Sequence, residues 1–223
     1  MEPEVSAGKA LLSVSKIGLQ EAYRYRQEKR FEHFSKCIDL TLERVSPEKA
    51  AEFRNYCNSL EGSERLAACA EAAAATICDR ARMAIALILC NDPDVDLDTA
   101  TKKQFVVALQ GKDDEILDFF LDAEKVTAYP DRNGRPYPRA GIHYLNYKKI
   151  GGGRWDAETI HAYIHELILC RMFLPDPDSD VTYMSDDKGW GLYFGVTERS
   201  HKMARLLEKA LLILELSKPI NSP

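Results

Sequence analysis

The sequence predicts a mainly α-helical protein, in which a helical bundle is followed by a small α/β unit. Two observations predict this arrangement. Apolar residues recur at steps of three and four over most of residues 18–127, which is the periodicity of amphipathic helices. After residue 156, one helical pattern is followed by two short strand patterns and a last helical pattern. Hydrophobic residues make up 45% of the 223-residue chain, enough to bury a core.

The bundle is expected to begin near Gly18. Residues 1–17 are rich in small and polar side chains, and we expect them to be disordered. A regular apolar stripe follows in the sequence, and its members are Phe31, Phe34, Ile38, Leu42 and Val45. Their spacing predicts one helix with a single buried face.

Helix-start signals place the next two helices. Ser46-Pro47-Glu48 combines an N-cap serine, a proline at the first helical position and an acid near the positive helix end. A longer helix is expected from Ser63 to about Cys90, with an alanine-rich middle that lets neighbouring helices approach closely. We expect this helix to lie at the centre of the bundle.

Two shorter helices complete the predicted bundle. Asp98 or Thr99 is expected to cap the first of them, and Gly111 to end it. Asp113 or Asp114 is expected to cap the second. The connections are short, as in antiparallel bundles.

Residues 128–155 have a different character. Gly141 and the triplet Gly151–Gly153 interrupt this segment, prolines are frequent, and acidic residues are almost absent. We expect an irregular, basic connector between the bundle and the last part of the chain.

Residues 156–217 predict a compact α/β unit. Asp156 is a favourable N-cap for a helix. Strand patterns at residues 181–184 and 191–196 flank a turn typical of a β-hairpin, and a last helix follows. Helix, hairpin and helix in this order predict a winged-helix-like unit with the hairpin as its wing. Residues 218–223 are expected to be a tail.

Composition and hydropathy favour one cellular compartment. None of the six cysteines has the CxxC spacing of metal or redox sites, and we interpret them as reduced thiols. Residues 1–16 lack the apolar segment of a signal peptide. The apolar run at residues 83–90 is too short to span a bilayer. We therefore expect a cytoplasmic protein without membrane contact.

The strongest functional signal is the basic and aromatic composition of residues 126–155. Six cations stand against one acid, Asp131, so this stretch has a net charge of +5 in a chain whose net charge is −5. Cations and aromatic rings together bind phosphates and stack on bases. A docking surface for an acidic protein and a solvated loop are the alternatives. The candidate residues for binding nucleic acid or a partner are Arg132, Arg135, Arg139, Tyr144, Tyr147, Lys148, Lys149, Arg154 and Trp155.

Other patterns carry less weight. His161 and His165 share a helical face, but no third metal ligand accompanies them. Alternating carboxylates at residues 92–98 and 176–180 have the spacing of calcium ligands, yet both segments lack the glycine at the sixth position. No motif for a catalytic nucleophile is present. We therefore predict no metal, no cofactor and no enzymatic activity.

Several short patterns within residues 23–121 carry a family resemblance: Arg30-Phe31-x-x-Phe34, Asp79-x-Ala81-x-Met83-Ala84, Phe105-x-x-x-Leu109 and Asp113-x-x-Ile116-Leu117. They resemble an uncharacterised helical domain family that is common in bacterial and phage genomes. Some members end in a winged-helix-like unit with a step similar to that from Tyr193 to Thr197. The resemblance implies a place in mobile-element or phage-defence systems.

Two functions follow as expectations. The first is a non-enzymatic accessory or assembly subunit of a bacterial or phage-encoded system, acting by protein–protein interaction. Its partner would be the product of a neighbouring gene or a second copy of the chain. The alternative is a DNA- or RNA-binding protein that uses the basic connector and the winged-helix-like unit.

Overall fold

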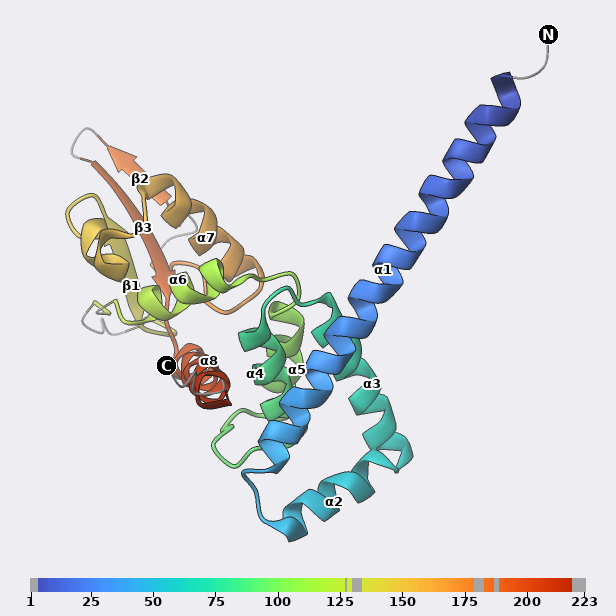
Figure 1. Ribbon diagram of the computed structural model, residues 1–223. Helices are drawn as coiled ribbons and strands as arrows, with labels where there is room; N and C mark the ends of the chain where they lie inside the picture. The colour runs from blue at the N-terminus through green and yellow to red at the C-terminus, as the bar shows by residue number, and fades with distance from the viewer. Residues whose placement is uncertain (1–3, 127, 130–133, 179–182, 187–188, 218–223) are drawn as a thin grey trace, which may run out of the picture.

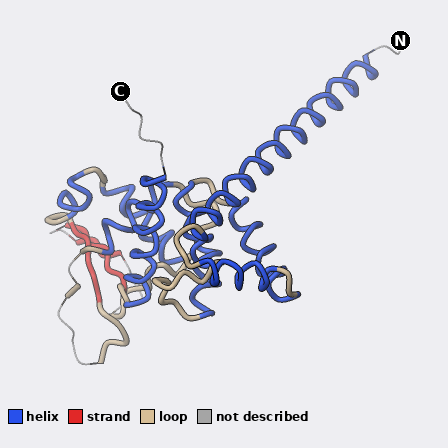
Figure 2. The backbone as a smooth tube through the Cα atoms, turned by 60° about the horizontal axis from the view of Figure 1, so that its bottom comes forward, coloured by secondary structure: helices blue, strands red, loops and turns tan. Residues whose placement is uncertain are grey.

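The computed structural model describes residues 4–126, 128–129, 134–178, 183–186 and 189–217. It is mainly helical, with one small antiparallel sheet, which confirms the predicted fold class at this level. The sheet lies at one end of the body, and the first helix runs out from the body on the other side (Figures 1 and 2). None of the described helices is long and apolar enough to cross a membrane.

The first helix, α1 (Glu4–Leu42), begins earlier than the sequence predicted. Disorder was expected for residues 1–17, with a helix only from Gly18. No proline follows Pro3 in this segment, and its alanine, leucine and lysine residues favour helix, so the local sequence does not interrupt the helix. The first half of α1 stands clear of all other elements (Figure 1).

Serine caps begin the next two helices. α2 (Pro47–Cys57) starts as predicted, because Ser46 accepts a hydrogen bond from a backbone N–H of the first turn. α3 (Leu60–Ala75) starts earlier than predicted, because Ser59 rather than Ser63 is its N-cap. Each serine oxygen satisfies an N–H group that has no partner within its helix.

α3 is followed after a short break by α4 (Asp79–Leu89), so the prediction of one continuous helix over residues 63–90 is wrong. Thr76 is extended, with φ −84° and ψ 140°. The guanidinium of Arg82 donates hydrogen bonds to the carbonyl oxygens of Thr76 and Ile77, at 2.9 and 3.2 Å. This buried arginine supplies partners for carbonyl groups that a continuous helix would have paired internally.

The two following helices begin where the sequence predicted. α5 (Thr99–Ala108) is capped by Asp98, and α6 (Asp114–Glu124) is capped by Asp113. In both cases the first of the two candidate caps is the one used. Each carboxylate accepts a hydrogen bond from the backbone N–H three residues later, at 2.9 and 3.0 Å.

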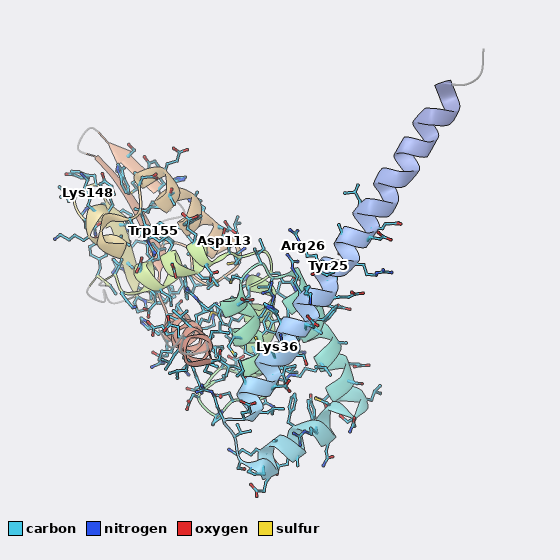
Figure 3. The ribbon with its side chains drawn as sticks, in the orientation of Figure 1. Tyr25, Arg26, Lys36, Asp113, Lys148 and Trp155 are labelled. Carbon is cyan, nitrogen blue, oxygen red and sulfur yellow. The ribbon has the colours of Figure 1, made fainter. Side chains whose placement is uncertain are left out.

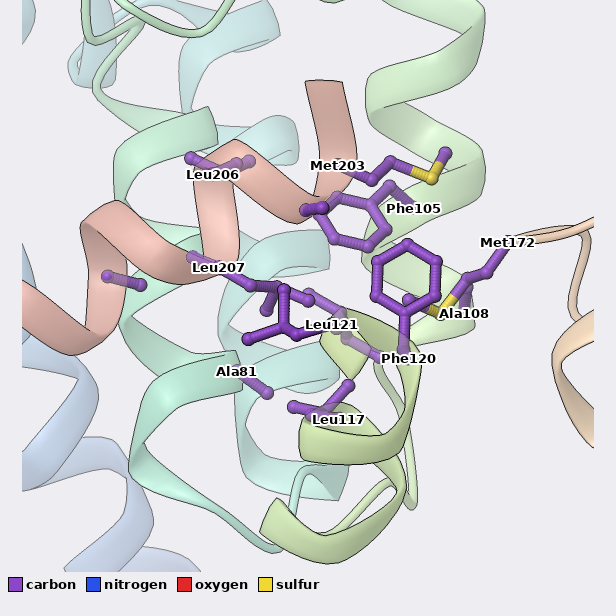
Figure 4. Packing of buried hydrophobic residues seen from close by; sticks show 14 of the residues in the cluster. Ala81, Phe105, Ala108, Leu117, Phe120, Leu121, Met172, Met203, Leu206 and Leu207 are labelled. Atoms are coloured by element: carbon purple, nitrogen blue, oxygen red, sulfur yellow. The ribbon is translucent and has the colours of Figure 1, made fainter. Parts of the chain in front are cut away.

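α4 lies at the centre of the molecule, and every residue from Arg80 to Leu89 is buried. α1 and α3 contact it on one side, and α8 (Glu198–Ser217) contacts it on another. Side chains of α8 meet those of α5 and α6 in one core, Leu207, Phe105 and Leu121 among them (Figure 4). The last helix of the predicted C-terminal unit is therefore part of the bundle.

The sheet has three antiparallel strands in the order β1-β3-β2. They are β1 (Arg139–His143), β2 (Tyr183–Asp186) and β3 (Gly189–Gly195). β1 lies inside the segment that was predicted to be an irregular connector, and it pairs with β3 along its whole length. Glycine and proline around this strand obscure the alternating pattern that would have revealed it.

β2 and β3 form the predicted hairpin, although β3 begins at Gly189 instead of 191. Residues 181 and 182 lie outside the described part of the chain. α7 (Ala157–Leu169) is capped by Asp156, as predicted, and packs against α6 and β3. β1, which precedes α7 in the sequence, thus belongs to the same sheet as the hairpin that follows α7. The winged-helix-like classification stays a prediction.

Candidate interaction surfaces

Two of the candidate arginines hold the turn that follows α7. The guanidinium of Arg139 donates to both carboxylate oxygens of Asp176, at 2.7 and 2.8 Å. The Asp176 side chain has no solvent exposure. Arg135 pairs with Asp178 in the same bidentate geometry, and the side chain of Arg135 is only 5% exposed. Planar arginine–carboxylate pairs of this kind are the strongest ion pairs that proteins make.

Arg139 also contacts the aromatic residues of the segment. Its guanidinium carbon lies 3.8 Å from the ring centroid of Tyr193 and 5.8 Å from that of Tyr129. The charge of Arg139 is thus shared between a carboxylate and a ring face, both within the chain. It therefore contributes little positive potential to an external phosphate.

A third candidate arginine, Arg154, follows the glycine-rich turn η1 (Tyr147–Gly153). It pairs with Asp118 and Asp122 of α6, at 3.2 and 3.1 Å. Its neighbour Trp155 is only 4% exposed, and the indole N–H donates to Asp122 at 2.9 Å. Trp155 was predicted as a surface contact, but it is a core residue that fixes the turn to α6 (Figure 3).

The remaining candidates differ in exposure. Lys148 and Lys149 are exposed, and neither forms an ion pair with any described residue. Tyr144 is 44% exposed, whereas Tyr147 is half-buried. Arg132 lies outside the described residues. Of the predicted basic stretch, two adjacent lysines therefore remain as uncompensated charges in the part of the chain that the structure describes.

The glycine triplet does not open a phosphate site at the start of α7. Asp156 already occupies this helix end, where its carboxylate accepts a hydrogen bond from the backbone N–H of Thr159 at 2.7 Å. That bond keeps the pKa of Asp156 below its usual value. A carboxylate thus takes the place in which the helix would hold an anion.

Cations of the same chain pair with carboxylates in both acidic turns. Lysines of α8 reach the first turn, where Lys209 pairs with Asp94 and Lys202 pairs with Asp96, each at 2.6 Å. Asp92 is a second partner of Lys209, at 2.5 Å. In the second turn, Asp176 pairs with Arg139 and Asp178 pairs with Arg135, as described above, whereas Asp180 lies outside the described residues. No group of three or more potential ligands among the described side chains is placed to hold a metal ion.

The histidine pair of α7 packs against the edge of the sheet. The ring centroids of His161 and His165 are 4.4 Å apart, and the ring of Tyr183 meets His161 edge-on at 5.0 Å. His165 also hydrogen-bonds through its Nδ1 with the carbonyl oxygen of His161, at 2.9 Å. Partial burial, and then the neighbouring His165, lower the pKa of His161. The lowered pKa favours the neutral form of the His161 ring.

None of the cysteine thiols with a strongly shifted pKa is chemically activated. Burial raises the pKa of Cys37 and of Cys90 to about 12, and that of Cys78 to about 11. A thiol with such a pKa is protonated at neutral pH and is a poor nucleophile. These cysteines are therefore packing residues.

A different surface, on α1, was not among the predicted sites. Leu19 is 72% exposed and Tyr23 is 66% exposed. In the other half of the same helix, Phe34 and Cys37 are buried against the bundle. Leu19, Tyr23, Arg30, Phe34 and Cys37 follow one another at steps of four, seven, four and three residues, so they share one helical face.

Arg30 marks the point where the bundle stops covering this face. Its guanidinium donates to the carbonyl oxygen of Ala74, at the end of α3, with a length of 2.6 Å. Beyond this contact, the face that carries Leu19 and Tyr23 is open. Tyr25 and Arg26 of this half of α1 lie far from Lys148, so the two candidate surfaces are separate (Figure 3).

In comparisons with known proteins, no family model matched the chain, no curated protein matched its sequence, and no solved structure matched its fold. The residues and their geometry therefore carry the functional argument.

Proposed function

We propose that this protein is a non-enzymatic assembly subunit that acts by protein–protein interaction, and that α1 pairs with α1 of a second copy. The observation that supports this is the uncovered continuation of a buried helical face. Phe34 and Cys37 bury the face against the bundle, whereas Leu19 and Tyr23 extend it into solvent. Membership of a bacterial or phage-encoded system remains part of the proposal, and it rests on the resemblance of residues 23–121.

An isolated helix that projects into water gains little stability from propensity alone, since most helical stability in proteins comes from packing of an apolar face. A second helix laid along the Leu19 and Tyr23 face would supply that packing. Symmetric pairs are the commonest assemblies of identical chains, because one surface patch serves both subunits.

Charge on the projecting half of α1 is compatible with self-pairing. Residues 18–33 carry four Lys or Arg and three Asp or Glu side chains, so two copies do not strongly repel each other. Two intrahelical pairs, Arg24 with Glu28 at 3.7 Å and Lys29 with Glu32 at 2.8 Å, reduce the local charge further.

Self-association is testable by sedimentation velocity and light scattering. We expect a species of twice the 25.2 kDa chain mass at micromolar concentrations. The double variant Leu19→Glu, Tyr23→Glu is expected to be monomeric, because each chain would then place acids on the paired face. The matched control is Val107→Glu, Leu212→Glu, at positions that are 64% and 55% exposed on α5 and α8.

The control variant is expected to keep the mass of the unmodified protein. Circular dichroism of both variants checks that the body remains folded. A monomeric unmodified protein at all concentrations would contradict the pairing, and so would a Leu19→Glu, Tyr23→Glu variant that associates as the unmodified protein does.

Nucleic-acid binding is the second candidate, and the exposure of Lys148 and Lys149 favours it. Two phosphate contacts release few counterions, so the logarithm of the binding constant should fall against the logarithm of salt concentration with a slope of about −2 or shallower. Fluorescence anisotropy with single-stranded and duplex DNA measures this slope. A slope much steeper than about −2 would mean that further cations take part, and would contradict the neutralisation of Arg135, Arg139 and Arg154.

A further inference from the structure

On the face of the sheet that turns away from the core, the central strand β3 carries mostly glycine. Alternate residues of a strand point to opposite faces. On β3, Leu192 and Phe194 are fully buried in the core, so Gly189, Gly191 and Gly195 belong to the other face together with Tyr193. On β1, Gly141 lies opposite Tyr193 and joins the same face.

Tyrosine rings lie directly against the glycines of this face. A Cβ atom at Gly141 would come within 2.8 Å of the rings of both Tyr129 and Tyr193. A Cβ atom at Gly189 would overlap the ring of Tyr144. Glycine is therefore required at these positions, because any side chain would displace an aromatic ring.

The rings line an open cavity of about 540 Å³ above the sheet. Its described side chains on this face are three tyrosines with His143 and Met184. No Lys, Arg, Asp or Glu lines it among the described residues. A concave aromatic site of this size is within the range of ligand-binding pockets.

The cavity also presents unused hydrogen-bonding capacity. The hydroxyl of Tyr144 makes no hydrogen bond to any described residue, and its side chain is 44% exposed. Burial, together with the neighbouring Tyr193, raises the pKa of Tyr129, so this phenol stays a neutral donor at physiological pH. The site thus combines ring faces with neutral donors.

We propose that this cavity binds a proline-rich segment of a partner protein in the polyproline II conformation. Such segments are uncharged and pre-ordered, they dock in aromatic-lined grooves, and their backbone carbonyl groups have no internal partners. A site that combines several tyrosine rings with neutral donors, and whose described lining residues are all without Lys, Arg, Asp or Glu, is complementary to them.

Charge argues against a nucleic acid as the occupant. Base-stacking sites for single strands combine their rings with cations that follow the phosphate backbone. Arg139, whose guanidinium lies on the ring of Tyr193, is neutralised by Asp176. This proposal concerns a different surface from α1 and does not depend on self-association.

Glycine-selective ¹⁵N labelling gives a direct test on the intact protein. The probe is a ten-residue oligoproline with blocked ends, titrated to about 1 mM, and a Gly-Ser peptide of equal length is the control. We expect the amide signals of Gly189 and Gly191 to shift with oligoproline, because these two glycines line the cavity. The signals of Gly62 and Gly111, which lie in the helical bundle, are expected to stay in place.

A pair of neighbouring variants separates the cavity from the adjoining surface. Tyr144→Ala removes one wall and is expected to weaken oligoproline binding at least tenfold. Leu145→Ala, at a residue that is 69% exposed and does not line the cavity, is expected to leave the affinity within twofold. The glycine spectrum of each variant shows whether the sheet is intact.

Three outcomes would overturn the proposal. Gly189 and Gly191 do not shift with oligoproline, or they shift equally with the Gly-Ser peptide, or they shift with oligothymidylate and not with oligoproline. The last outcome would assign the cavity to stacked bases instead.

Discussion

Replacing Asp176 by alanine is expected to destabilise the protein by about 3–5 kcal/mol, the range observed when one partner of a buried ion pair is removed. The Asp176 side chain has no solvent exposure, and both of its oxygens accept hydrogen bonds from Arg139, whose side chain is 15% exposed. Without the carboxylate, the only ion pair that the guanidinium of Arg139 keeps among the described residues is a longer one to Asp178, at 3.5 Å. Urea unfolding followed by circular dichroism measures the loss.

Two further variants identify the cause of the loss. Asp96→Ala removes an equally short ion pair, to Lys202, at a side chain that is 82% exposed, and we expect a much smaller change in the free energy of unfolding. Asp176→Leu combined with Arg139→Met removes both charges and should be more stable than Asp176→Ala. If the double variant is no more stable than the single one, the stranded charge of Arg139 is not the cause.

The Arg139–Asp176 ion pair also explains why the sequence predicted a larger basic surface than the structure has. Arg139 and Asp176 are separated by 37 residues, and Arg154 and Asp118 by 36. Charge counted within residues 126–155 cannot include carboxylates that folding brings from α6 and from the turn after α7. The composition therefore located an important segment, since it contains β1 and η1, but it assigned the arginines to an external ligand.

Locally determined features were predicted well. Ser46, Asp98, Asp113 and Asp156 each cap a helix where the sequence indicated, because capping depends on a few adjacent residues. The break at Thr76 was missed, because it contains neither glycine nor proline and depends on hydrogen bonds from Arg82.

The candidate surfaces depend on contacts between residues that are far apart in the sequence. The cavity needs β1 and β3 to pair, which brings Gly141 opposite Tyr193, and no local pattern encodes that register. The open face of α1 was detectable only once the edge of the bundle was known, because Leu19 and Phe34 lie on the same face of one helix. What distinguishes them is their exposure, 72% against 3%.

The glycine triplet allows a second large effect to be predicted. Gly151 has φ +56°, and a Cβ atom at this position would overlap both Asp122 Oδ2 and the indole nitrogen of Trp155. Gly151→Ala therefore combines the cost of a left-handed backbone, about 1–2 kcal/mol, with loss of the Trp155–Asp122 hydrogen bond, about 1–3 kcal/mol. We expect a total loss of about 3 kcal/mol in urea unfolding.

Gly152→Ala is the matched control for this variant. Gly152 has φ +66°, yet nothing lies within 4 Å of a Cβ atom built on it. Only the backbone cost applies there, so we expect a loss of about 1 kcal/mol. The difference between the two variants measures how strongly the turn is held to α6 by the buried Trp155. Equal losses at Gly151 and Gly152 would mean that Asp122 and Trp155 move aside without cost, and that η1 is positioned by its backbone conformation alone.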